Sequence, residues 1–220
     1  MVEPNRDQDQ AAPPVQSDGT ESFGVERLLK GNERFLDAIA RSPDPVGLTS
    51  ALASADPYAI VLGCSDSRVP PELVFDEETG RLFVVRVASN VAGQPEIGSV
   101  EYAIARWGCP LVVVLGHTQC GGVAAAMDRL PPGAEKPPTD SGAVSLGPLL
   151  SSIKFNLGMV SATAGDPWLE AVTLNVNRTV EGLHIWSPMI RARVKLGQLS
   201  VVGAIYHVET GQVEFLDPSS

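Results

Sequence analysis

Short apolar runs separated by helical patterns dominate the middle of the chain. Three runs are nearly continuous in apolar residues, as expected of strands buried on both faces of a parallel sheet. They cover residues 58–63, 82–86 and 110–116. Between the second and third runs, residues 95–107 show a helical pattern, with Pro95 at its start and Gly108 directly after it. This strand–helix–strand order predicts a parallel sheet with a right-handed crossover.

Apolar positions at helical spacing predict further helices on either side of these strands. An amphipathic helix is expected near the start, with one face made by Val25, Leu28, Leu29, Phe35 and Ile39. A Gly-rich turn at 116–122 leads into an Ala-rich helix, and three more helices are expected at 144–158, 168–183 and 187–196. Apolar residues at 199–206 and 212–216 around the Glu209–Gly211 turn predict a hairpin.

These elements predict one α/β domain, with a mainly parallel central β-sheet flanked by helices and a C-terminal hairpin or edge strands. The domain is expected to span residues 23–217, because neither an internal repeat nor a second kind of composition appears. Residues 1–22 are rich in Asp, Gln, Pro and Ser, which predicts a disordered or loosely attached arm. Residues 131–142 are rich in Pro and Gly and predict a mobile loop.

Composition excludes several classes of protein. Of the 220 residues, 44% are hydrophobic, so the chain can build a core without disulfides. The net charge of -10 and pI of about 4.7 argue against a nucleic-acid partner. The sequence has no apolar run long enough to span a membrane. Its polar first residues lack the apolar segment of a secretory signal, which predicts a cytoplasmic location.

Two of the three cysteines occupy equivalent places relative to the predicted strands. Cys64 directly follows the first strand, whereas His117 and Cys120 follow the third. Ligands gather at the carboxyl ends of parallel strands, so these side chains can converge. Two thiolates and an imidazole select zinc, and three protein ligands leave a fourth position for water or substrate. Cys109, at a helix-to-strand junction, is interpreted as a buried small residue.

An acidic and a basic residue lie directly beyond the first candidate ligand. The stretch CSDSRVPPE places Asp66 and Arg68 within four residues of Cys64. The carboxylate can bind the metal itself or accept a hydrogen bond from a metal-bound water. The guanidinium can hold the carboxylate away from the metal through a bidentate pair.

These motifs together resemble the β-class carbonic anhydrase family. The resemblance is carried by CSDSRVPPE and GHTQCGG, in that order, with LFVVR, GSVEYAIA and VVVLG between or beside them. It extends over roughly residues 24–217. The combination of Cys-x-Asp-x-Arg with a later His-x-x-Cys is highly specific.

The resemblance implies a function and a set of site residues. It implies one zinc ion per chain on Cys64, His117 and Cys120, with Asp66 and Arg68 as the catalytic pair. The implied reaction is reversible hydration of CO2 to bicarbonate and a proton, through attack of zinc-bound hydroxide on CO2. The resemblance also implies a homodimer or a higher oligomer such as a homotetramer, with active sites at the subunit interface. The expected substrate pocket comprises Phe83, Ala88, Tyr102, Gly121 and Gly122.

Three positions depart from patterns found in the family. Val61 stands where some members carry the Trp of a bicarbonate-regulated closed form, so the chain resembles the constitutively open subtype. Ala55 stands where a substrate-binding Gln is usual, and Val87 where an Asn is usual. The last two differences alter the hydrogen bonding expected in the pocket.

Two alternative functions stay open at this point. The first is a hydrolase of a CO2-like sulfur compound, such as carbonyl sulfide or carbon disulfide, on the same scaffold. The second is a catalytically silent zinc module that pairs with another protein. A thiol redox function is weaker, because the chain lacks a Cys-x-x-Cys motif.

Overall fold

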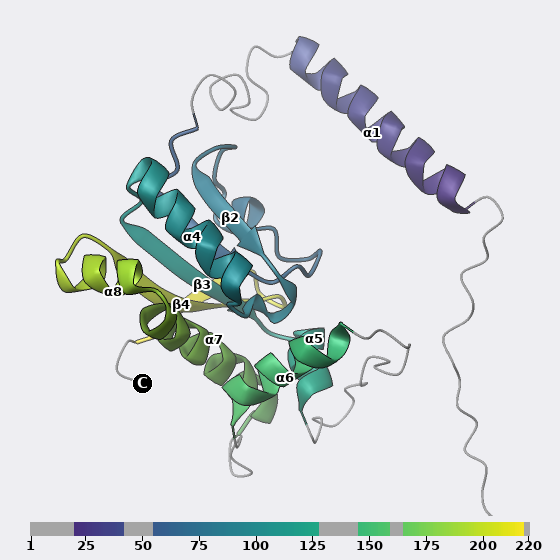
Figure 1. The fold of residues 1–220 in the computed structure, drawn as a ribbon. Helices are drawn as coiled ribbons and strands as arrows, with labels where there is room; N and C mark the ends of the chain where they lie inside the picture. The colour runs from purple at the N-terminus through teal and green to yellow at the C-terminus, as the bar shows by residue number, and fades with distance from the viewer. Residues whose placement is uncertain (1–19, 42–54, 128–144, 159–164, 218–220) are drawn as a thin grey trace, which may run out of the picture.

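The computed structural model describes residues 20–41, 55–127, 145–158 and 165–217. Their strands form one five-stranded sheet with the order β2-β1-β3-β4-β5 (Figure 1). The strands are β1 (Ala59–Gly63), β2 (Leu82–Arg86), β3 (Leu111–His117), β4 (Ser200–His207) and β5 (Gln212–Phe215). The predicted α/β class with a mainly parallel sheet is confirmed.

The register of the sheet brings the ends of β1 and β3 together. β1 pairs in parallel with β2 on one side and with β3 on the other, so that Gly63 lies opposite Leu115. β4 runs parallel to β3, and β5 returns antiparallel to β4, which confirms the predicted C-terminal hairpin. The carboxyl ends of β1, β2 and β3 therefore share one edge, where ligands usually bind in such sheets.

Helices connect and flank these strands. They are α1 (Thr20–Arg41), α3 (Pro71–Val74), the 3-10 turn η1 (Ala88–Asn90), α4 (Gln94–Trp107), α5 (Gly121–Ala126), α6 (Leu146–Leu157), α7 (Pro167–Trp186) and α8 (Pro188–Lys195). The longer helices extend the predicted ranges by a few residues or fall slightly inside them. α3 and η1 were not predicted, because single turns leave no periodicity in the sequence.

The two faces of the sheet bury different groups of side chains. On one face, Ile60 and Val112 pack with residues of α4, α7 and α8. On the opposite face, Val61 and Val113 pack with Val74 and Phe75 beside the short helix α3. This alternation along each strand follows from the two-residue period of β-structure.

A close approach of α7 to β3 requires a glycine at position 116. A Cβ atom there would lie 2.5 Å from Val176 Cγ2 and 3.2 Å from Val172 Cγ1. Gly116→Ala is therefore expected to lower the free energy of unfolding by about 1–3 kcal/mol through overpacking, as measured by urea denaturation. The matched change Gly98→Ala in α4 meets no atom within 4 Å and should be neutral or stabilising by up to about 1 kcal/mol. Equal effects of the two substitutions would contradict this packing.

Helix α1 exposes the apolar residues that the sequence predicts for one of its faces, apart from Ile39, whose side chain is outside the described part of the chain. Leu28, Leu29 and Leu36 are 76%, 60% and 56% exposed, and Val25 and Phe35 are also exposed. The predicted boundary at residue 22 falls inside this helix, which begins at Thr20. Residues 1–19 of the predicted arm and the predicted loop at 131–142 lie outside the described residues. Across the described part of the chain, helices long and apolar enough to cross a membrane are absent.

Candidate metal centre

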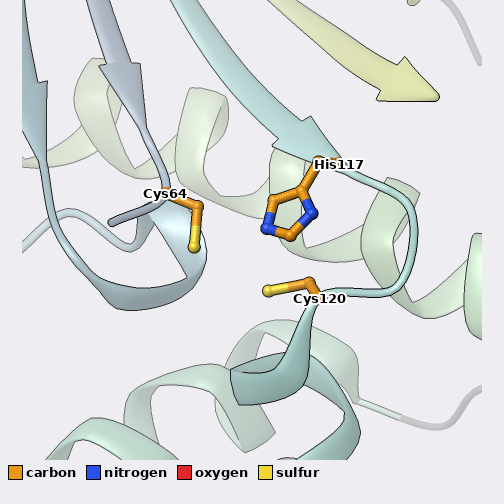
Figure 2. A group of neighbouring side chains, drawn as sticks. All are labelled: Cys64, His117 and Cys120. Atoms are coloured by element: carbon orange, nitrogen blue, oxygen red, sulfur yellow. The ribbon is translucent and has the colours of Figure 1, made fainter. Parts of the chain in front are cut away.

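The three predicted ligands converge at the shared edge of the sheet. Cys64 directly follows β1, His117 ends β3, and Cys120 immediately precedes α5. Figure 2 shows their side chains pointing toward one another. All three are buried, and their candidate ligand atoms lie within 4.8 Å of one another. Sequence reasoning placed His117 after the strand; the strand extends one residue further and includes it.

The ring of His117 is oriented by its own backbone neighbour. His117 Nδ1 lies 2.8 Å from the carbonyl oxygen of Thr118, which can only accept a hydrogen bond, so Nδ1 carries the proton. His117 Nε2 is buried and has no hydrogen-bond partner among the described residues. A buried nitrogen without a partner is costly unless it binds an ion. Its unprotonated lone pair is what a metal ligand requires.

The two thiols influence each other's ionisation. A hydrogen bond from Cys64 lowers the pKa of Cys120 to about 6, aided by the Ser89 side chain and the Gly122 and Val123 N–H groups. The same hydrogen bond to Cys120, with burial, raises the pKa of Cys64 to about 12. Near neutral pH the pair therefore holds one proton. A second negative charge in this buried place needs a cation beside it.

These pKa values predict how metal binding depends on pH. Burial and the hydrogen bond to Cys120 raise the pKa of Cys64 well above neutrality, so Cys64 must lose its proton to bind zinc and binding at pH 7.5 should release at least one proton. Apparent zinc affinity should therefore rise with pH around this value. Calorimetric titrations in buffers of different ionisation enthalpy measure the released protons. Binding that releases no proton at pH 7.5 would contradict the predicted ionisation of the pair.

The donor set fits zinc. Two soft sulfurs and one imidazole are typical zinc ligands, and three of them leave one tetrahedral position open. Zinc bonds of about 2.0–2.3 Å place the ligands of one ion within about 4 Å of each other. The observed limit of 4.8 Å is compatible with this spacing.

Asp66 and Arg68 form the bidentate pair that the sequence predicts. Arg68 Nε and Nη2 donate to Asp66 Oδ1 and Oδ2 at 3.0 and 2.8 Å, and the Arg68 backbone N–H donates to Oδ1 at 2.9 Å. These bonds from Arg68 lower the pKa of Asp66 to about 2. The carboxylate is thus ionised at any pH near neutrality. The Asp66 N–H also donates to the Cys64 sulfur at 3.4 Å, which ties this pair to the candidate metal ligands.

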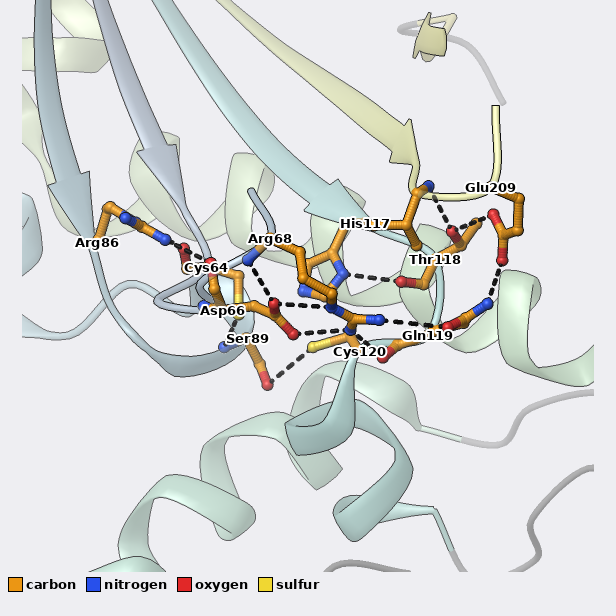
Figure 3. Close-up of polar contacts among 11 residues, drawn as sticks. Cys64, Asp66, Arg68, Arg86, Ser89, His117, Thr118, Gln119, Cys120 and Glu209 are labelled. Atoms are coloured by element: carbon orange, nitrogen blue, oxygen red, sulfur yellow. Dashed lines mark hydrogen bonds and ion pairs between the residues drawn. The ribbon is translucent and has the colours of Figure 1, made fainter. Parts of the chain in front are cut away.

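Several residues that sequence reasoning missed hold this arrangement in place (Figure 3). Arg86, at the end of β2, donates to the carbonyl oxygens of Cys64 and Asp66. Gln119 accepts from Arg68 Nη1 at 3.3 Å, and its amide donates to Glu209 at 2.6 Å. The position of Arg86 at a strand end was a usable signal for its role. The role of Glu209 was not predictable, because it depends on contacts across 90 residues.

The predicted pocket aromatics pack together on α4 and β2. The rings of Phe83 and Tyr102 are 6.2 Å apart, and both lie beside the Trp107 ring. Tyr102 is 57% exposed. The described ring contacts thus place both aromatics in an aromatic cluster of this chain, and their role in a substrate pocket stays a prediction.

The other predicted pocket residues lie close to the ligands. Ala88 is the first residue of η1, and Gly121 and Gly122 begin α5 directly after Cys120. The N–H group of Gly122 hydrogen-bonds the Cys120 sulfur. Contact with substrate stays a prediction for all three residues.

The two departures from the family pattern differ in their surroundings. Val87 is half-buried and packs against the cluster of Ile60 and Val112 and also against a second cluster that contains Cys64 and Cys120. Its backbone also joins the site, because the Ser65 N–H donates to the Val87 carbonyl at 3.2 Å. Ala55 is exposed at the edge of a described segment. The Val87 side chain therefore contributes to packing in place of a polar contact.

Comparison with known proteins identifies the family. The fold and ligand set define an α/β protein with a Cys–His–Cys centre at the carboxyl ends of its parallel strands. A family model described as carbonic anhydrase matches residues 59–213, and the chain belongs to this family. A carbonic anhydrase from Mycolicibacterium smegmatis is 36% identical over 194 residues, covering 85% of this chain and 89% of the relative.

Solved structures agree with this assignment. A β-carbonic anhydrase from Coccomyxa, in complex with acetazolamide, superposes with a TM-score of 0.70 at 27% identity and covers 87% of this chain and 86% of its own. A tetrameric β-carbonic anhydrase from Sordaria macrospora shares the fold with a TM-score of 0.65 at 21% identity, covering 89% and 97% of the two chains. The predicted resemblance to the β class is confirmed.

Proposed function

We propose that this protein is a zinc lyase that catalyses the reversible hydration of CO2 to bicarbonate and a proton. One observation carries the proposal. The unpartnered Nε2 of His117 and two buried cysteine sulfurs converge, and a carboxylate held by Arg68 lies beside them. A closed structural zinc site needs four protein ligands and no such carboxylate.

When bound in this centre, a zinc ion would lower the pKa of a water molecule from 15.7 to about 7 and so provide a nucleophile at neutral pH. Cys64, His117 and Cys120 would hold that ion and leave one position open. Arg86 and Thr118 fix two of these ligands, through the Cys64 carbonyl and the His117 ring. The residues of the chain thus provide a prearranged site, which avoids reorganisation during the reaction.

Asp66 is suited to orient the nucleophile. Its Oδ1 accepts two hydrogen bonds from Arg68, whereas its Oδ2 accepts one, from Nη2. A carboxylate oxygen has two lone pairs, so Oδ2 retains one acceptor site. Because Arg68 keeps Asp66 ionised, this oxygen can accept a hydrogen bond but cannot donate one. Asp66 would therefore hold the attacking water with its lone pair toward the substrate.

Stopped-flow assays with CO2 and with carbonyl sulfide test this proposal. The purified protein should hydrate CO2 faster at pH 8.5 than at pH 7.5, since the nucleophile is a deprotonated water. Carbonyl sulfide should be turned over more slowly. A protein that carries zinc but acts only on carbonyl sulfide would move the assignment to the sulfur substrate. A zinc protein without either activity would favour the silent binding module.

We also propose that the protein is a homo-oligomer of at least two subunits. Large apolar side chains are exposed on α1 and elsewhere, including Tyr102, Phe155 and Trp186. Exposed apolar groups of this size are typical of surfaces that a partner covers. The prediction is a mass of at least two chains of 23.2 kDa by light scattering after size-exclusion chromatography. A mass of one chain at micromolar concentration would contradict it.

A further inference from the structure

One residue outside the predicted set contacts both cysteine sulfurs. Ser89 lies in η1, directly beyond β2, and is 0% exposed. Its backbone N–H donates to Cys64 Sγ at 3.2 Å, and its hydroxyl lies 3.5 Å from Cys120 Sγ (Figure 3). A zinc-bound cysteine is a thiolate that can only accept a hydrogen bond, so in the zinc-bound protein the Ser89 hydroxyl would be the donor. Ser89 therefore bridges the two sulfur ligands, which come from different strands.

The backbone of Ser89 adopts a conformation that serine rarely takes. Its φ is 59°, and the next residue, Asn90, also has a positive φ of 44°. Such a conformation costs a non-glycine residue on the order of 1–3 kcal/mol and persists only where the surroundings impose it. A glycine would adopt it freely but would lack the hydroxyl. Serine at position 89 therefore combines a strained backbone with a hydroxyl group that contacts the Cys120 sulfur.

Two buried amides impose this conformation. Asn175 on α7 donates to the Ser89 carbonyl at 2.7 Å, and Asn156 on α6 donates to the Asn175 side-chain oxygen at 2.9 Å. Asn156 also donates to Thr179 at 3.3 Å. Asn175 and Asn156 are only 1% and 7% exposed. A buried polar chain of this kind is stable only if its members are satisfied, so it fixes η1 against two helices.

The start of α5 leaves room for the Ser89 hydroxyl. A Cβ atom on Gly122 would lie 2.1 Å from Ser89 Oγ, whereas the next atoms, Ser89 Cβ and Ile153 Cδ1, would be 3.5 and 3.7 Å away. The hydroxyl therefore occupies a space that exists because residue 122 lacks a side chain. Its position is set by packing from α5 and by the amides from α7 and α6.

We propose that Ser89 is a positioning residue of the metal centre, holding the Cys64 and Cys120 sulfurs at the spacing that a zinc ion requires. The inference rests on the proposed zinc site. Its N–H and O–H groups offset negative charge on the two thiolates and restrict their side-chain rotation. Outer-shell donors of this kind typically change metal affinity by 10–100-fold. Loss of the hydroxyl should therefore weaken zinc binding without removing a ligand.

Two substitutions separate this role from a purely structural one. Ser89→Ala removes the hydroxyl and keeps the strained backbone, whereas Ser89→Gly removes the hydroxyl and relieves the strain. Ser99→Ala is the control, because it deletes a hydroxyl that bonds only its own helix, at Pro95, on exposed α4 surface. Zinc affinity is measured by competition with a chromophoric chelator. The thiolate-to-metal absorption of the Co2+-substituted protein reports the geometry of the sulfurs.

Both Ser89 variants are expected to bind zinc about 10–100-fold more weakly and to shift the Co2+ absorption, while Ser99→Ala matches the wild type. Metal-free Ser89→Gly should unfold at the same temperature as the metal-free wild type or at a higher one. Wild-type affinity and an unchanged spectrum in both variants would overturn the proposal. The proposal would also be overturned if the metal-free Ser89→Gly protein were less stable than the metal-free wild type by the same free energy as its loss in zinc binding. If the wild type binds no zinc, the proposed function and this inference both fail.

Discussion

Replacing Cys120 by serine is expected to remove both zinc retention and CO2 hydration. The hydroxyl of serine stays protonated near neutral pH, whereas the Cys120 thiol ionises with a pKa of about 6. The variant would therefore lose one of the two thiolate ligands, and a neutral hydroxyl would stand in its place. Loss of a residue that only supports a ligand lowers metal affinity by up to about 100-fold. Loss of the Cys120 ligand itself should lower zinc affinity by more than that. Zinc content after dialysis and the hydration rate are both measured on the same sample.

The matched control is Cys109→Ser, which changes another buried thiol. Cys109 is 2% exposed and donates to the carbonyl oxygen of Pro57 at 3.0 Å, a bond that a serine hydroxyl can also make. This variant should keep its zinc and its rate. Full zinc retention in Cys120→Ser would show that the metal is held elsewhere.

Replacing Asp66 by asparagine is expected to lower kcat by about 10²–10⁴-fold, the usual contribution of a positioned proton-transfer or orienting group. The amide carries no charge, so its oxygen accepts more weakly and its NH2 group faces the donors of Arg68. Zinc content should stay at the wild-type level, because the three ligands are unchanged. The measurement is the steady-state rate at saturating CO2, with zinc determined on the same protein.

A surface pair provides the control for the change in charge. Glu181→Gln removes a carboxylate that contacts Arg178 at 2.7 Å on exposed α7 surface, and it should leave kcat unchanged. A wild-type kcat in Asp66→Asn would contradict the orienting role. Loss of zinc from Asp66→Asn would show that Asp66 acts on the metal ligands instead.

Sequence reasoning predicted that Cys64, His117 and Cys120 converge because its signals are local. Cys64 and His117 each follow a glycine at the end of an apolar run, and parallel strands bring such ends together. Asp66 and Arg68 are two residues apart, so their pairing needs little tertiary information. The sheet and its hairpin were predictable for the same reason, since buried strands are short, continuous apolar runs.

The parts that were missed depend on contacts between distant residues. Ser89 and Asn175 are 86 residues apart, and the left-handed backbone of Ser89 is imposed by that contact, against its own preference. Gln119 likewise has a positive φ of 57°, which places its side chain between Arg68 and Glu209. A sequence pattern reports average preferences, so it cannot reveal residues held against theirs.

The most direct test of the central claim is a zinc titration of the metal-free protein, with the CO2 hydration rate measured by stopped flow after each addition. The account predicts that activity rises linearly and stops rising at one zinc per chain, with the three ligands Cys64, His117 and Cys120 filled. A protein that takes up one zinc per chain without gaining any hydration activity would contradict it. Activity in the metal-free protein that zinc does not change would contradict it equally.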